Sequence, residues 1–117
     1  MLSRAHRLRG DAVFKHLMRV GRPFFGQSIT FRIAPQGDDR SQPSRFAFVV
    51  STKVSKKAVE RNLLRRRLRE IIRKVLPRIK SGLDIMISTR PQACKLSFQE
   101  LEQEVHALLT KSRLWIS

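Results

Sequence analysis

The chain has 117 residues and carries 25 Lys and Arg against 9 Asp and Glu, a formal net charge of +16 at pH 7. A chain of this length can bury a single core without disulfides, and so large an excess of positive charge predicts an anionic partner, either nucleic acid or an anionic membrane. No run of the sequence approaches the roughly 18 to 20 apolar residues of a membrane-spanning helix, and the N-terminal residues return to charge too soon for a signal peptide, so we expect a cytoplasmic protein with no membrane partner.

Residues that commonly bind metal or form disulfides are sparse. Cys94 is the one cysteine, so the chain can form no internal disulfide and no two-cysteine metal site. His6, His16 and His106 are too scattered to give the ligand spacing of a zinc site. We therefore predict no metal site on the protein and an ordinary structural role for Cys94.

The first predicted element is a short helix near the N-terminus. Apolar residues between Val13 and Met18 recur at helical spacing, with Asp11 placed to be the N-cap and Gly21 placed to end the helix. The residues before it, 1–9, are basic, and we expect them to form a flexible arm.

Two strands are predicted next. Ile29, Phe31 and Ile33 alternate with polar residues, and an apolar run over 46–51 follows a segment rich in turn-forming residues. The pair at 24–25 leaves open a further short strand ahead of them.

The segment 53–80 holds twelve Lys and Arg against two Glu. Apolar residues recur through it at helical spacing, so we predict a helix over about 56–76 that ends before Pro77. A helix that faces only water normally interleaves both signs of charge, because like charges three or four residues apart repel. The predicted buried stripe of this helix comprises Leu64, Leu68, Ile71, Ile72 and Val75.

The C-terminal part of the chain predicts one more strand and one more helix. Leu83, Ile85 and Ile87 recur at every second residue, as on one face of a strand, and Arg90 and Pro91 end the strand. Ser97 and Glu100 have the spacing of a capping box at the start of a helix. The apolar stripe of that helix comprises Leu101, Val105, Leu108 and Leu109.

The order of the predicted elements, α-β-β-α-β-α, favours an α+β fold. We expect a two-layer α/β sandwich, in which helices pack on a mixed sheet of three to four strands. No internal repeat or long linker divides the chain, so residues 1–117 are predicted to form a single domain, and its positive charge favours nucleic acid as the partner.

One edge of the basic helix concentrates hydrogen-bond donors. On a helical wheel five residues fall on one line that flanks the buried stripe. Arginine suits such a line because its planar guanidinium can bind a phosphate with two hydrogen bonds or stack on a base. The alternative is a solubilising face, but the acidic partners that such a face would carry are missing. The five residues are Asn62, Arg65, Arg66, Arg69 and Arg73.

The run KKAVERNLLRRRLREIIRK resembles the signature helix of the bacterial ribonuclease P protein component. The likeness extends over nearly the whole chain, including the FKHLMRVG, FAFVVSTK, LDIMISTRP and LSFQELEQEV segments. One position departs, since Leu63 stands where the family usually has a second arginine. The matching residues are Arg61, Asn62, Leu64, Arg65, Arg66, Leu68, Arg69 and Glu70.

The resemblance implies an endoribonuclease holoenzyme in which the chemistry lies in a large RNA that uses magnesium ions, and not in this chain. The protein would bind that RNA and the 5′ leader of precursor tRNA and assist removal of the leader. Its partners would be the ribonuclease P RNA and precursor tRNA, with no obligate protein partner. The resemblance also implies a left-handed connection from the second long strand through the basic helix. The expected RNA-binding residues are Lys53, Lys56, Lys57, Arg61, Asn62, Arg65, Arg66, Arg69 and Arg73.

The resemblance further implies a leader cleft between the first helix and the sheet. Phe14 would be a stacking platform there, and Met18 stands where a second aromatic residue is common. Thr30 and Arg32 would line the strand side of the cleft. From helical spacing alone, plain core packing is the competing reading for Phe14 and Met18.

Two other functions are compatible with parts of the sequence. A self-sufficient nuclease would need clustered carboxylates or a histidine pair, whereas the acidic residues here are dispersed and no catalytic residue is predicted. A structural or ribosomal RNA-binding protein without a role in cleavage would share the charge and size. It would need the basic helix but no aromatic cleft.

Overall fold

The computed structural model describes residues 6–8, 10–36 and 41–116, and it has the predicted order of helices and strands. Helices α1 and α2 span Asp11–Val20 and Ala58–Val75, and α3 spans Phe98–Lys111. The strands are β1 (Arg22–Phe25), β2 (Ile29–Pro35), β3 (Arg45–Val49) and β4 (Leu83–Thr89). Short 3-10 turns lie at Leu76–Arg78 and Pro91–Lys95. The α+β fold predicted from the sequence is confirmed.

The four strands form one mixed sheet in the order β1-β2-β4-β3. β1 pairs with β2 and β2 with β4 in antiparallel register, whereas β3 and β4 are parallel. The short strand that the sequence left open is therefore β1, at one edge of the sheet. The parallel pair requires a crossover, and α2 supplies it, because parallel neighbours cannot be joined by a tight turn. This β3-α2-β4 unit is the one to which the left-handed prediction applies.

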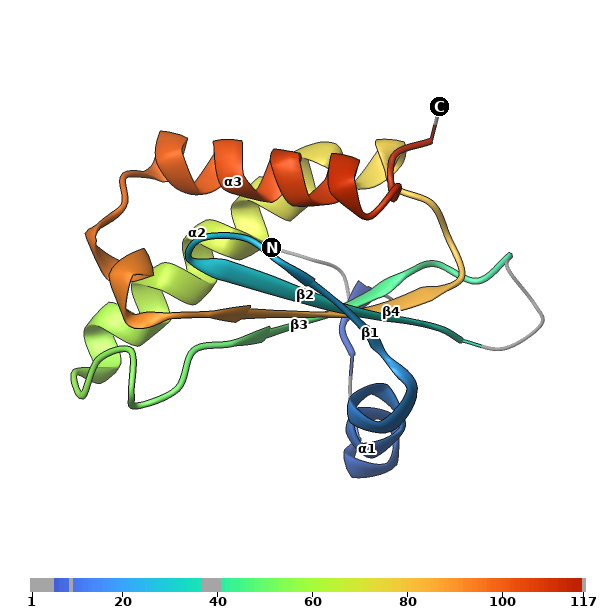
Figure 1. The fold of residues 1–117 in the computed structure, drawn as a ribbon, viewed down its shortest axis with the longest axis horizontal. Helices are drawn as coiled ribbons and strands as arrows, with labels where there is room; N and C mark the ends of the chain where they lie inside the picture. Colours follow the sequence, from blue (N-terminus) through green and yellow to red (C-terminus); the bar gives the residue numbers. More distant parts are fainter. Residues whose placement is uncertain (1–5, 9, 37–40, 117) are drawn as a thin grey trace.

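The main core lies between the sheet and two helices. Figure 1 shows α2 and α3 on one face of the sheet and α1 on the other. Ile29 and Phe31 of β2 and Ile85 and Ile87 of β4 are fully buried on the face toward α2 and α3. The whole stripe predicted for the basic helix is buried against them. The alternating strand pattern and the helical stripe thus meet as the sequence predicts.

A second, smaller apolar cluster fixes α1 to the opposite face. Its buried members are Leu8, Leu17, Ala34 and Ala47, with Phe14 packed partly against them. Because successive strand residues point to opposite faces, Ala34 and Ala47 belong to the side of the sheet away from the main core.

The start and end of α1 depend on glycine. Gly10 is the N-cap with φ of 93°, so the prediction that Asp11 caps this helix was wrong and Asp11 is its first residue. A positive φ favours glycine over residues that carry a side chain. At Gly21, a Cβ atom would lie 2.2 Å from the Leu17 carbonyl oxygen and 2.6 Å from Cγ of Arg32. The chain can therefore turn from α1 into β1 over Arg32 only with glycine.

The other helix ends follow the sequence signals. α2 ends at Val75, just before Pro77, and α3 begins with the predicted capping box. The Glu100 amide donates to Oγ of Ser97 at 3.1 Å, and the Ser97 amide donates to Oε1 of Glu100 at 3.0 Å. The bond from the Ser97 backbone lowers the pKa of Glu100. None of the helices in the described ranges is long and apolar enough to cross a membrane.

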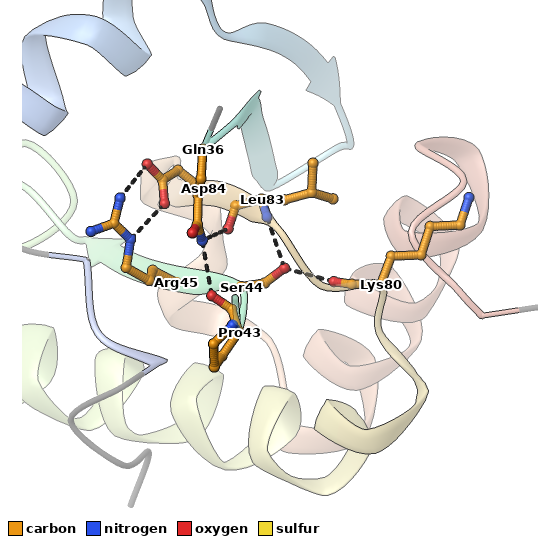
Figure 2. Close-up of polar contacts among 7 residues, drawn as sticks. All are labelled: Gln36, Pro43, Ser44, Arg45, Lys80, Leu83 and Asp84. Atoms are coloured by element: carbon orange, nitrogen blue, oxygen red, sulfur yellow. Dashed lines mark hydrogen bonds and ion pairs between the residues drawn. The ribbon is translucent and has the colours of Figure 1, made fainter. Parts of the chain in front are cut away.

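A polar network joins the ends of three strands (Figure 2). Oγ of Ser44 donates to the Lys80 carbonyl at 2.6 Å and accepts from the Leu83 amide at 3.1 Å. Nε2 of Gln36 donates to the carbonyls of Pro43 and Leu83, both at 2.9 Å. Ser44 is 4% exposed, so these bonds satisfy polar groups that the fold removes from water.

The predicted arm over residues 1–9 is described only at residues 6–8. There Leu8 is buried, its amide donates to the Phe46 carbonyl at 2.8 Å, and Arg7 forms a bridge with Phe46. These residues are packed along the outer edge of β3. Residues 1–5 and 9 lie outside the described part of the chain.

Candidate nucleic-acid interface

The outer face of α2 presents the predicted donor line to solvent. Asn62, Arg66, Arg69 and Arg73 are exposed, and Arg65 is partly buried. The helix places them together because they recur at spacings of three and four residues. The face opposite carries the buried stripe, so the main core fixes the direction in which the donors point.

Arg65 and Asn62 hold each other in place. Nη2 of Arg65 donates to Oδ1 of Asn62, and Nη1 of Arg65 donates to the Val50 carbonyl at 3.3 Å. The guanidinium therefore links the helix to the end of β3. Asn62 accepts this bond through Oδ1, so its amide NH2 group remains available to donate to a ligand.

Arg69 extends over the edge of the sheet. Its Cζ lies 5.9 Å from the centre of the Phe48 ring, within the range of a cation–π contact. A hollow of about 500 Å³ lies on the α2 surface beside it. The residues that line this hollow are Val59, Asn62, Leu63, Arg65, Arg66 and Arg69.

Two apolar residues of this hollow were missed by the sequence reasoning. Val59 is 80% exposed, and Leu63, which the helical wheel sets apart from the donor line, is partly buried and lines the same hollow as Asn62. Val59 and Leu63 are four residues apart and so share one side of α2. That spacing, on a helix otherwise rich in arginine, was the available signal.

Arg73 is the one predicted donor that forms an ion pair among the described residues. It is joined to Glu70 by two hydrogen bonds, one of them from Nε to Oε2 at 3.0 Å. The hydrogen bond from Arg73 lowers the pKa of Glu70. Glu70 is not among the five residues of the donor line, but its side chain meets that of Arg73 at a spacing of three residues. Arg73 can reach a phosphate only in competition with this carboxylate.

The remaining predicted basic residues lie at the start of α2. Lys53, Lys56 and Lys57 are exposed, and Lys57 is the N-cap residue. Nη1 of Arg61 donates to the Ser55 carbonyl at 2.8 Å and so fastens the turn that leads into the helix. An anion held here would also meet the positive end of the helix dipole.

Phe14 lies between the basic surface of α2 and the predicted leader cleft beside α1. It is partly buried and lines a cavity of about 360 Å³ together with Ala47 and Phe48 of β3 and Arg69 of α2. Arg7, Leu8 and Phe46 complete the wall. The cavity thus has apolar walls, a phenylalanine from α1 and a guanidinium from α2, which could together hold one base and its phosphate.

The other predicted cleft residues do not line this cavity. Met18 is 54% exposed, one turn further along α1. Thr30 and Arg32 lie on the α1 side of β2, as predicted, since Ile29 and Phe31 point to the main core. Nη1 of Arg32 donates to the Gly21 carbonyl at 3.1 Å and ties β2 to the end of α1. The structure therefore brings Phe14 together with Arg69 and Phe48, which the sequence reasoning had not joined.

Acidic residues do not form a metal centre in the part of the chain that the structure describes. No group of three or more His, Cys, Asp or Glu there could hold a metal ion. Lys74 and Glu102 pair at 2.8 Å on the surface, and Asp84 pairs with Arg45. Desolvation, with the nearby Glu60 charge, raises the pKa of Cys94, which favours its neutral thiol.

These features define a small, basic α+β protein whose cations are concentrated on the crossover helix. The family model described as Ribonuclease P matches residues 2–113. The chain belongs to the family of ribonuclease P protein components.

Relatives and solved structures agree with this assignment. The chain is 39% identical over 119 residues to the ribonuclease P protein component of a Synechococcus strain, covering 100% of this chain and 89% of that one. It is 36% identical to that of Chloroflexus aurantiacus over 114 residues, covering 97% and 82%. Its fold is similar to the RNase P protein of Thermotoga maritima, with a TM-score of 0.78, 28% identity and coverage of 90% and 96%. The Staphylococcus aureus RNase P protein, at 19% identity, has the same fold with a TM-score of 0.86, covering 97% and 100%.

Proposed function

We propose that this chain binds the ribonuclease P RNA and the 5′ leader of precursor tRNA, and assists endonucleolytic removal of the leader. Membership of the family supports the role of a subunit. The observation that carries the finer proposal is that Phe14 and Arg69 line one cavity. The basic surface of α2 is thereby continuous with an aromatic pocket beside α1, which a general RNA-binding helix would not require.

In this proposal α2 binds structured RNA through its phosphates. Arg66 and Arg69 are exposed and have no carboxylate partner among the described residues. Arg65 is held toward Asn62 and Val50, so it would meet a ligand with little further loss of side-chain freedom. Lys53, Lys56, Lys57 and Arg61 extend the surface toward the positive end of the helix.

The leader would enter from the α1 side. Phe14 offers a ring face for an unpaired base, and Arg69 offers a charge for the adjoining phosphate, a combination that suits single-stranded nucleic acid. Met18, Thr30 and Arg32 would meet the leader further along the sheet. The thioether of Met18 can pack on a base but has no ring to stack.

The chemistry would lie in the RNA subunit. Phosphodiester hydrolysis by the protein would need a held metal ion or positioned acid and base groups, and no group of three or more His, Cys, Asp or Glu among the described residues could hold a metal ion. Magnesium prefers carboxylate and phosphate oxygens, and the donors gathered on α2 are cationic, so they do not fit this ion. We propose that the magnesium ions are bound mainly by the RNA and that the holoenzyme acts in the cytoplasm.

The test is cleavage of precursor tRNA by a ribonuclease P RNA with and without the purified chain. We expect the chain to raise kcat/KM at a low magnesium concentration, because binding of the leader adds to the affinity for substrate. A chain that binds the RNA and leaves kcat/KM unchanged would instead be a structural RNA-binding protein. The RNA of a cyanobacterium with a similar protein component provides a suitable partner.

A further inference from the structure

A second basic groove lies at the opposite edge of the sheet from Arg69. It runs between β1 and the C-terminal end of α3 and has a volume of about 410 Å³. Its apolar walls include Phe24, Ile33 and Leu114. Figure 1 shows the end of α3 and the segment that leads into β4 lying above the same end of the sheet. Two backbone bonds join them, from the Lys80 amide to the Leu114 carbonyl at 2.9 Å and from the Ile116 amide to the Arg78 carbonyl at 2.8 Å.

Three cations from three separate segments line this groove. They are Arg22 of β1, Lys80 before β4 and Arg113 after α3, and no carboxylate lines it with them. Within the described ranges none of the three forms an ion pair. Cζ of Arg22 lies 5.4 Å from the centre of the Phe24 ring. In Figure 2 the Lys80 side chain extends away from the Ser44 network, so that network uses its backbone and leaves the ammonium group for another contact.

The backbone of Arg113 has an unusual conformation for an arginine. Its φ is 60°, the left-handed conformation that ends many helices, and it is the sole described residue other than glycine with a positive φ. Glycine is preferred at such a position, because the Cβ atom of any other L-residue crowds the backbone there. The chain therefore holds an arginine where backbone energetics favour glycine, and this arginine lines the groove.

We propose that this groove binds a single-stranded segment of RNA, separate from the RNA that contacts α2. Bases would pack on Phe24, and phosphates would pair with Arg22, Lys80 and Arg113. An apolar floor with an aromatic ring and a rim of cations is the chemistry that single-stranded nucleic acid requires. An acidic peptide would satisfy the cations but has no need of the ring. Because β1 and β3 are opposite edges of the sheet, the protein would hold two RNA segments at once.

Arg113→Gly is the decisive variant, because glycine suits a φ of 60° and the fold should be kept or stabilised. The probe is a ten-nucleotide oligouridylate, followed by amide NMR shifts and fluorescence anisotropy. The wild-type chain should show shifts at residues 22, 24, 80 and 114 as well as on α2. Arg113→Gly should bind about fivefold more weakly at 0.1 M salt, the expected effect of one lost phosphate contact on a single strand. The triple variant Arg22→Gln, Lys80→Gln, Arg113→Gly should lose on the order of 10²-fold.

The matched control is Lys95→Gln, which removes one charge at an exposed residue outside the groove and off α2. Equal weakening by Lys95→Gln and Arg113→Gly would overturn the proposal, as would shifts confined to α2. A polyglutamate peptide that shifts the groove amides at a lower concentration than the oligouridylate would assign the groove to a protein and also overturn it.

Two measurements on the holoenzyme identify the source of the segment. Weaker binding of Arg113→Gly to the ribonuclease P RNA alone would place the segment in the RNA subunit. A raised KM for precursor tRNA with unchanged assembly would place it in the substrate. No change in either would overturn the proposal, while leaving the Phe14 and α2 assignments intact.

Discussion

Arg45 and Asp84 stand directly opposite each other on the parallel strands β3 and β4 and are joined by two hydrogen bonds. Nε of Arg45 donates to Oδ1 of Asp84 at 2.8 Å and Nη2 donates to Oδ2 at 2.9 Å (Figure 2). The Asp84 side chain is 4% exposed and that of Arg45 is 34% exposed. A carboxylate with so little contact with water depends on its partner.

Arg45→Met should therefore destabilise the fold strongly. It leaves the Asp84 carboxylate buried without a countercharge, and losing one partner of a buried pair costs about 3 kcal/mol or more. The free energy of unfolding in denaturant measures this cost. The double variant Arg45→Met, Asp84→Leu should recover much of it, because both charges are then removed. Lys74→Met, which breaks the exposed pair with Glu102, should cost less than about 1 kcal/mol.

Leu68→Ala should cost about 2 to 5 kcal/mol of stability. Leu68 is fully buried between α2 and the sheet, and truncation leaves a cavity that the core cannot fill. The denaturant midpoint should fall without a change in the secondary structure. Leu63→Arg is the control on the outer side of the same helix. It should be nearly neutral for stability and should strengthen RNA binding, and a large loss of stability would show that the Leu63 contacts are structural.

The buried side of α2 could be predicted from the sequence because apolar residues at helical spacing form a single stripe, and that stripe packs against the core. Leu64, Leu68 and Ile72 had to meet an apolar partner, and the alternating strands were the available one. The outer side could not be predicted as well. A helical wheel gives the direction of each side chain from the helix axis but not how far a long side chain extends. It therefore could not show that Arg73 pairs with Glu70 or that Leu63 lines the hollow beside Asn62.

The leader cleft shows the same limit over a longer distance. Alternation was enough to place Thr30 and Arg32 on the face opposite Ile29 and Phe31, but only the family resemblance implied that the first helix covers that face. Alternation could not show that Arg32 donates a hydrogen bond to the Gly21 carbonyl, or that Arg69 and Phe14 line the same cavity. Those contacts depend on how α1 and α2 pack on opposite faces, which no local pattern encodes.

Binding to the ribonuclease P RNA should depend steeply on salt. With about five phosphates neutralised by α2, raising monovalent salt from 50 to 200 mM should weaken binding on the order of 10²- to 10³-fold. Arg69→Gln should reduce the affinity by about 1 to 3 kcal/mol and leave the thermal midpoint unchanged, since Arg69 is exposed. Lys95→Gln again controls for the loss of one charge. A flat salt profile would contradict the electrostatic role of α2.

Phe14→Leu should weaken binding of precursor tRNA selectively. Leucine keeps much of the apolar packing but loses a stacking contact worth about 1 to 3 kcal/mol. Holoenzyme affinity should fall for precursor tRNA with a leader of several nucleotides and should change little for mature tRNA. Equal losses for both would mean that Phe14 is only a packing residue. Met18→Phe is the companion variant and should raise the affinity for the leader, because Met18 is exposed and the new ring would be free to stack.

Glu70 should restrain Arg73 at neutral pH and release it in acid. The pKa of Glu70 is lowered in the folded chain, so the stabilising pair is present above the carboxyl group's ordinary value of 4.5 and is lost as pH falls through the lowered pKa. An NMR titration of the Glu70 carboxyl carbon should have its midpoint below 4.5, and Arg73→Gln should move it back toward that value.

Glu70→Gln tests the same pair at neutral pH. It should tighten RNA binding and make the salt dependence steeper by about one phosphate contact, because Arg73 no longer has a competing carboxylate. Unchanged affinity would show that Arg73 does not reach the RNA.

The hydrogen bond from the Leu8 amide to the Phe46 carbonyl also covers the edge of the sheet at which another copy of the chain could add a strand. An uncovered edge strand offers a row of free backbone groups to which another strand can add. Residues 6–8 occupy that position beside β3, and at the other edge β1 contains Pro23, which has no amide hydrogen to donate. Both edges are thus protected against strand addition. A chain shortened to begin at residue 10 would expose the edge of β3 and should aggregate at concentrations where the full-length chain stays in solution.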